Sequence, residues 1–239
     1  MRQPHILYAS FFTVLTLLAA PGQLAAQSTG AATAAPQYQL GDINIESSRV
    51  YTKVFKSTSI GHEHGVEGRL QRGRISLGST GGSGELVFDL RTFRADTDTA
   101  RKYVGLSDST DAATAQKVNQ NMLGGQVLNT GKFPTAVFTI QSSTAMPEPS
   151  QRGLLQYRLD GVLELHGVKR QLSVLADVTE QNGWTHLRGG FKLKQTDFGI
   201  TPFSKAFGAI GVADVVTVYG DFWVAGTPQQ MAQRATQQR

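Results

Sequence analysis

The sequence predicts an all-β protein, either a sandwich or an up-and-down barrel of about eight antiparallel strands with a short helix in one long connecting loop. Three observations support this prediction. Apolar and polar residues alternate along most of the chain, short turns join the alternating segments, and no repeat or linker divides residues 38–226. Alternation with a period of two is typical of half-buried antiparallel strands. Closure into a barrel would also remove the sheet edges that promote aggregation.

The composition excludes several classes of protein. The 239 residues include no cysteine and carry a formal net charge of +5. Without cysteine there is no disulfide framework, thiolate zinc site, iron–sulfur cluster or covalently attached haem, so the core alone must hold the fold. The basic residues are spread along the chain, so we expect no nucleic-acid partner. The small positive excess is better suited to an anionic membrane surface.

The first 26 residues are typical of a secretory signal peptide. Arg2 precedes an uncharged apolar run over residues 6–20, which Pro21 ends and small residues follow. The run is shorter than the roughly 20 apolar residues that a spanning helix needs. We expect cleavage near Ala26 and a periplasmic or extracellular protein, with an uncleaved anchor as the alternative. Residues 27–37 then form a small polar spacer.

The alternation predicts the strands in order along the chain. In residues 157–166, for example, Leu159, Leu163 and Leu165 fall on one face and charged residues on the other. Gly167 and the pair at residues 182–183 predict tight hairpin turns. The last residues, 227–239, form a Gln-rich tail that we expect to fray, with a short helix as the alternative. The predicted strands are residues 50–56, 66–77, 85–90, 136–142, 157–166, 171–179, 187–194 and 216–224.

Two connections depart from this pattern. Residues 94–134 contain a predicted helix that begins after Asp111 as N-cap and ends at Leu123, before two glycines. A connection this long often serves as a lid or a binding loop. The second connection, residues 196–213, is rich in Gly and Phe and suits the mouth of a barrel.

Four short motifs, in order along the chain, resemble those of the YceI-like family, and the resemblance covers residues 38–225. It implies a lipocalin-like antiparallel barrel in a secreted or periplasmic protein that binds lipids or polyisoprenoids. Relatives can pair as dimers, which leaves a homodimer open for this chain. The matching segments are residues 133–138 (FPTAVF), 161–170 (GVLELHGVKR), 196–200 (TDFGI) and 211–216 (GVADVV).

On this resemblance we expect the barrel to bind or carry an apolar isoprenoid-type or quinone-like lipid, and no other cofactor. A core filled by side chains is the alternative, because alternation alone does not separate a solid barrel from a hollow one. We expect Phe198 and Phe203 near the mouth. The expected lumen residues are Phe88, Phe138, Leu163, Leu165, Phe191, Leu193, Val216, Val218 and Phe222.

The histidines offer a rival hypothesis, a periplasmic metal-binding protein. In a strand, His62 and His64 would place both imidazoles on one face, as a zinc or copper pair needs. The third ligand could be His166, His186 or Glu67. Alternatively, His62, His64 and His166 form a polar rim that receives a lipid headgroup. The sequence shows no nucleophile elbow, phosphate loop or dinucleotide fingerprint, so we do not expect an enzyme.

Overall fold

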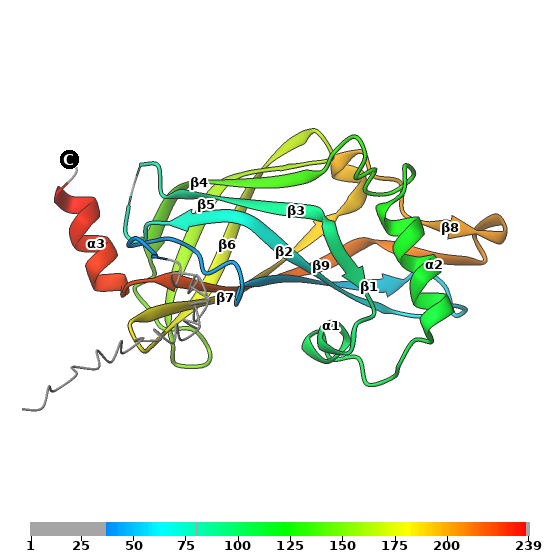
Figure 1. Ribbon diagram of the computed structural model, residues 1–239, viewed down its shortest axis with the longest axis horizontal. Helices are drawn as coiled ribbons and strands as arrows, with labels where there is room; N and C mark the ends of the chain where they lie inside the picture. Colours follow the sequence, from blue (N-terminus) through cyan, green and yellow to red (C-terminus); the bar gives the residue numbers. More distant parts are fainter. Residues whose placement is uncertain (1–36, 80, 238–239) are drawn as a thin grey trace, which may run out of the picture. The chain divides into compact units, whose positions relative to one another are not determined.

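The computed structural model describes residues 37–79 and 81–237, so the predicted signal peptide lies outside the described residues. Nine strands form one antiparallel sheet, in which β1 also pairs with β9 and closes a barrel (Figure 1). The strands are β1 (Arg49–Lys56), β2 (His64–Ile75), β3 (Gly84–Ala95), β4 (Thr135–Ala145), β5 (Leu155–Leu165), β6 (Val168–Gln181), β7 (Trp184–Lys194), β8 (Ser204–Lys205) and β9 (Ile210–Ala225).

Three α-helices and two short 3₁₀ helices complete the described elements. They are α1 (Asp98–Tyr103), α2 (Ala112–Leu123), η1 (Gln195–Phe198), η2 (Ala206–Gly208) and α3 (Pro228–Gln237). Among the described residues, no helix has the length and apolar character needed to cross a membrane.

The predicted fold class is confirmed. Each of the eight predicted segments overlaps one strand. Each strand from β1 to β6 pairs with the next along the chain, and β7 pairs with β9. The pairing of β1 with β9 over Arg49–Lys56 decides for a closed barrel and against a sandwich. The two-residue strand β8 was not predicted and pairs only with the start of β9.

The predicted turns and the predicted helix are also confirmed. His166 and Gly167 have φ values of 53° and 76°, the left-handed pair that a two-residue hairpin turn requires. Helix α2 begins after Asp111, whose carboxylate accepts a hydrogen bond from the amide of Thr114 at 3.0 Å. It ends at Gly124. Helix α1 was not predicted; its cap is Thr97.

The two ends of the barrel differ. Because the strands are antiparallel, the connections β1–β2, β3–β4, β5–β6 and β7–β9 all lie at one end, which we call the mouth end. This end carries α1, α2, η1 and β8, whereas α3 lies at the opposite, closed end (Figure 1). At the closed end Ile43 forms a bridge with Val224 and is buried.

In the tail, residues 228–237 form the helix α3, so the alternative of a short helix holds there and the expectation of fraying does not. Met231 is 1% exposed and lines a surface hollow together with Leu40 and Ile75. Two buried apolar residues, Pro228 and Met231, therefore anchor a helix whose other residues are mostly polar.

Candidate functional site

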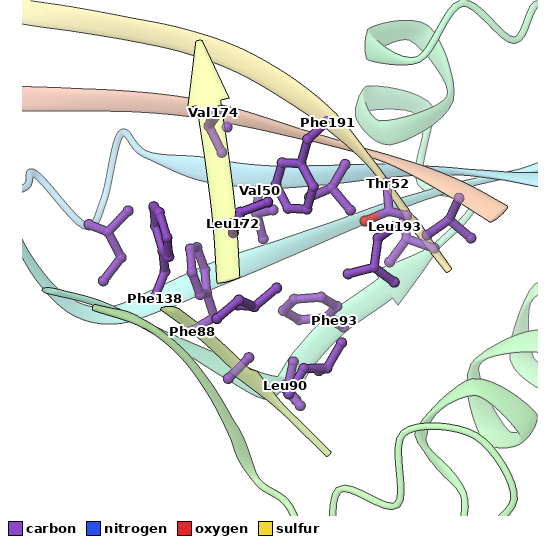
Figure 2. A pocket seen from close by; sticks show the side chains of 18 of the residues that line it. Val50, Thr52, Phe88, Leu90, Phe93, Phe138, Leu172, Val174, Phe191 and Leu193 are labelled. Atoms are coloured by element: carbon purple, nitrogen blue, oxygen red, sulfur yellow. The ribbon is translucent and has the colours of Figure 1, made fainter. Parts of the chain in front are cut away.

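The barrel encloses a cavity of about 200 Å³ beneath the mouth end. Its wall is apolar: of the residues that line it, only Thr52 and Gln195 carry a polar side chain. Figure 2 shows aromatic and aliphatic side chains from several strands converging on this space. An engineered apolar cavity of about 150 Å³ stays dry and can bind benzene. The lumen is therefore neither filled by its own side chains nor suited to water.

Nine of the residues expected in the lumen line this cavity. They come from β3, β4, β5, β7 and β9, and Phe88 and Phe222 face each other with ring centroids 6.2 Å apart. The alternation of the sequence predicts the positions of these side chains because each strand keeps one face toward the interior. They are Phe88, Phe138, Leu163, Leu165, Phe191, Leu193, Val216, Val218 and Phe222.

The two phenylalanines expected at the mouth do not line the cavity. Phe198 is buried in the hydrophobic core, and Phe203 is half-buried against that core. The 3₁₀ helix η1 turns the chain so that Gln195 instead lies on the cavity wall, where its amide nitrogen donates to the carbonyl of Ala213 at 2.9 Å.

Sequence reasoning missed several cavity residues. Phe93 lies on the wall because β3 bulges where it pairs with β2. Asp89 pairs with Arg69 and Arg94 pairs with Glu67, so β3 advances five residues while β2 advances two. A bulge changes which face a side chain takes, so simple alternation fails beyond it. The connection after β3 also supplies lining residues that no period predicts, namely Met122, Val127 and Leu128.

Helix α2 covers part of the mouth end and is tied to the barrel by one side chain. Asn119 accepts a hydrogen bond from the amide of Ala95, the last residue of β3, at 2.9 Å. The same side chain donates to the carbonyl of Ala115 within α2 at 2.7 Å. No residue of α2 is fully buried, so the helix lies on the barrel rather than within its core.

His166 lies in the β5–β6 turn at the mouth end. Its Nδ1 is 3.2 Å from the carbonyl oxygen of Phe198, to which it can donate a hydrogen bond, and its ring lies 4.4 Å from that of Phe133. The other ring nitrogen, Nε2, is buried and has no hydrogen-bond partner within the described part of the chain. A buried polar nitrogen without a partner is costly unless a water or a ligand satisfies it.

His64 is engaged in a buried ionic cluster beside α1. Its Nδ1 lies 2.7 Å from one oxygen of Asp96, and the guanidinium of Arg101 lies 2.8 Å from the other. Arg101 is 3% exposed and also contacts Asp108. Desolvation raises the pKa of the Asp96 carboxyl, but hydrogen bonds and charge from His64, with hydrogen bonds from Arg101 and the Gly65 amide, outweigh it and hold the pKa below its ordinary range.

The proposed metal ligands do not come together. His62 is exposed in the β1–β2 connection, Glu67 accepts a hydrogen bond from Thr97, and His186 lies 2.7 Å from Asp221. Across residues 37–79 and 81–237, no group of three His, Asp or Glu side chains is arranged to hold a metal ion.

Comparisons with known proteins agree with this architecture. The model of the YceI-like domain matches residues 42–222. A crystal structure of BcnA from Burkholderia cenocepacia superposes with a TM-score of 0.50 at 15% identity, covering 76% of this chain and 99% of that one. At such low identity the superposition supports the fold alone.

Two further solved structures show weaker likeness. One is described as a polyisoprenoid binding domain from Saccharophagus degradans implicated in plant cell wall breakdown, with a TM-score of 0.49, 14% identity, and coverage of 79% of this chain and 100% of that one. The other is the YCEI protein of Campylobacter jejuni, with a TM-score of 0.41, 10% identity, and coverage of 90% and 99%. No curated protein matches the chain. The family match spans most of the barrel, and the chain belongs to the YceI-like family.

Proposed function

We propose that this protein binds and carries an apolar isoprenoid-type or quinone-like lipid, with the chain of the lipid inside the barrel, in the periplasm or outside the cell. The apolar cavity beneath the mouth end is the observation that supports this proposal most directly. The expected signal peptide supports the location, and the resemblance to the YceI-like family supports the class of ligand.

The driving force is the transfer of an apolar chain out of water. Each buried methylene group contributes about 0.8 kcal/mol, so ten such groups contribute about 8 kcal/mol before the costs of association. In proportion to the engineered cavity that holds benzene, about 200 Å³ corresponds to roughly eight carbons. A longer chain would therefore displace wall side chains or extend through the mouth past α2.

The polar groups at the mouth end would receive the headgroup. The unpartnered Nε2 of His166 supports this role best, because a headgroup hydroxyl could donate a hydrogen bond to it while Nδ1 donates to the carbonyl of Phe198. His62 lies at the same end in the exposed β1–β2 connection, while one ring nitrogen of His64 is already bound to Asp96. We assign the headgroup contact to His166 first.

The cavity wall favours binding over catalysis. None of the residues that line it has a carboxylate, imidazole, amine or thiol, the groups that general acid–base or nucleophilic chemistry needs. A carrier, a reservoir or a sink for a lipid needs none of these groups.

Native mass spectrometry of the secreted protein tests the proposal. We expect a mass increment of a lipid that organic extraction removes, and we expect Val218→Trp to lose it because the indole fills the cavity. Thr217→Trp is the matched control, since Thr217 is the preceding residue of β9 and does not line the cavity. Both variants are checked for folding by circular dichroism. A metal-sized increment would favour the rival hypothesis, and neither increment would reject lipid carriage.

A further inference from the structure

Two connections at the mouth end form an exposed apolar tip. Ile60 in the β1–β2 connection is 58% exposed, and Phe207 and Ile210 around β8 and the start of β9 are 113% and 42% exposed. We call residues 57–61 and 203–211 the mouth tip. Figure 1 shows β8 projecting beyond the barrel at the end that carries α2. Six large hydrophobic side chains are exposed among the described residues, and three of them gather here.

Hydrogen bonds join the two connections into one unit. The amide of Ser57 donates to the carbonyl of Gly211 at 3.0 Å, and the hydroxyl of Thr58 donates to the carbonyl of Ala209 at 2.9 Å. A β-carbon on Gly61 would lie 3.8 Å from Cγ2 of Ile210, which shows that the two loops are in close contact. Ile60 and Ile210 therefore belong to the same surface.

The backbone holds Phe207 in an uncommon conformation. Its φ is 55°, in the left-handed region that a bulky L-residue rarely adopts, and that of Ala206 is 52°. Such outliers persist where the surrounding structure imposes them, and they concentrate at functional positions. Here the strained turn presents a full aromatic ring to solvent rather than to the core.

The charges around the tip are positive. Residues 56–62 and 203–213 include Lys56 and Lys205 but no acidic side chain. The ammonium of Lys205 lies 5.5 Å from the centroid of the Phe203 ring. Three of the acidic residues nearest the tip have partners: Glu63 pairs with Lys53, Asp108, which lies near His62, pairs with Arg101, and Asp214 accepts hydrogen bonds from Thr196. Asp197 is exposed in η1.

We propose that the mouth tip docks on an anionic lipid bilayer. A protruding apolar surface beside lysines suits a bilayer interface, because the rings enter the boundary between headgroups and acyl chains while the ammonium groups meet anionic headgroups. Docking there sets the mouth of the lumen against the membrane, so an apolar chain can pass between the two without crossing water. The purpose of docking rests on the proposed function, whereas the docking itself rests on the tip.

Flotation with vesicles of equal parts phosphatidylglycerol and phosphatidylcholine tests this proposal. We expect the protein to bind these vesicles, and Phe207→Ser to lower the partition coefficient about tenfold. Leu175→Ser is the matched control, because Leu175 is 45% exposed on β6, outside the tip. Every variant keeps the same N-terminal segment, so the differences report on the tip.

A charge reversal tests the electrostatic contribution to vesicle binding. Lys205→Glu should weaken binding by about tenfold at low salt and by less at high salt, while Arg152→Glu in the β4–β5 connection should change it little. Equal binding by Phe207→Ser and the parent protein would overturn the proposal. So would light scattering that shows the tip variants altering a dimer instead of vesicle binding.

The same variants keep the two proposals distinguishable. Phe207→Ser should still show the lipid-sized mass increment, since Phe207 does not line the cavity. A protein that binds vesicles but carries no lipid would reject the proposed function and keep the docking. A protein that carries lipid but does not bind vesicles would reject the docking and keep the proposed function.

Discussion

The aromatic ring of Phe93 occupies the space that a β-carbon on Gly68 would need. Gly68 lies in β2 opposite Val50, and the ring of Phe93 reaches it from the bulged part of β3. Both the ring and Val50 line the cavity. The size of the lumen therefore depends on a glycine whose side of the sheet is taken by a neighbouring strand's aromatic ring.

Gly68→Ala should push the Phe93 ring toward the cavity. We expect the affinity for an apolar probe to fall about tenfold and the free energy of unfolding to fall by about 1–3 kcal/mol. Fluorescent-lipid titration and urea unfolding measure the two effects. Gly125→Ala is the control, since nothing lies within 4 Å of the β-carbon it would add. An unchanged affinity would show that the ring can retreat without entering the lumen.

His166 should tolerate asparagine better than alanine. Its φ of 53° suits asparagine, whereas alanine pays about 1–2 kcal/mol in that region. Both variants lose the imidazole hydrogen bond to Phe198, about 1 kcal/mol. Urea unfolding should therefore rank the parent above His166→Asn and His166→Ala last. If the imidazole meets a headgroup, both variants also bind the lipid more weakly, and equal binding would assign that contact elsewhere.

Asn119→Ala should speed the exchange of ligand. The side chain is the hydrogen-bonded link between α2 and the end of β3, and removing one hydrogen bond of about 1 kcal/mol corresponds to roughly a fivefold change in rate. Stopped-flow displacement of a fluorescent lipid measures the dissociation rate. Gln116→Ala removes an exposed amide on the same helix and should leave the rate unchanged. Equal rates in the two variants would mean that α2 does not limit exchange.

Arg101→Met should be strongly destabilising. The change leaves the carboxylate of Asp96, whose side chain is 0% exposed, without its guanidinium partner. Breaking a buried ion pair in this way costs about 3–5 kcal/mol. Arg72→Met removes an exposed pair with Glu85 and should cost at most about 1 kcal/mol. Thermal and urea unfolding of the two variants make the comparison, and similar losses would show that the cluster is not essential to the fold.

Asp96 should also make the free energy of unfolding depend on pH in the acid range. The pKa of its carboxyl is lowered in the folded protein, so between the folded and unfolded pKa values the unfolded state binds more protons. This contribution is complete above the unfolded pKa, near 4, and is lost as the pH falls through the folded pKa. Urea unfolding over a series of acid pH values should show a steeper decline for the parent than for Asp96→Asn. Parallel curves would contradict this assignment.

The strands could be predicted because each has one face in the core. Phe138 and Leu163 alternate with polar neighbours, and the structure places both on the cavity wall. The helix α2 could be predicted because Asp111 and Gly124 mark its ends locally.

The rest depended on contacts between distant segments. The bulge that turns Phe93 inward arises from the pairing of β3 with β2, and the sequence of β3 alone shows no sign of it. Phe198 looked available for ligand because it lies in a Gly-rich connection, but η1 turns it into the core. The cluster of His64, Asp96 and Arg101 joins residues whose spacing matches no motif.

The closed end determines the order in which a ligand can enter and leave the lumen. Ile43 and Met231 are buried at that end, while the described cavity residues extend to α2 and η1 at the other. A chain that enters such a blind tube by its tail must back out headgroup first, so loading and unloading share one path and cannot overlap. The protein would then work as a shuttle that empties before it refills, and not as a conduit through which lipid flows.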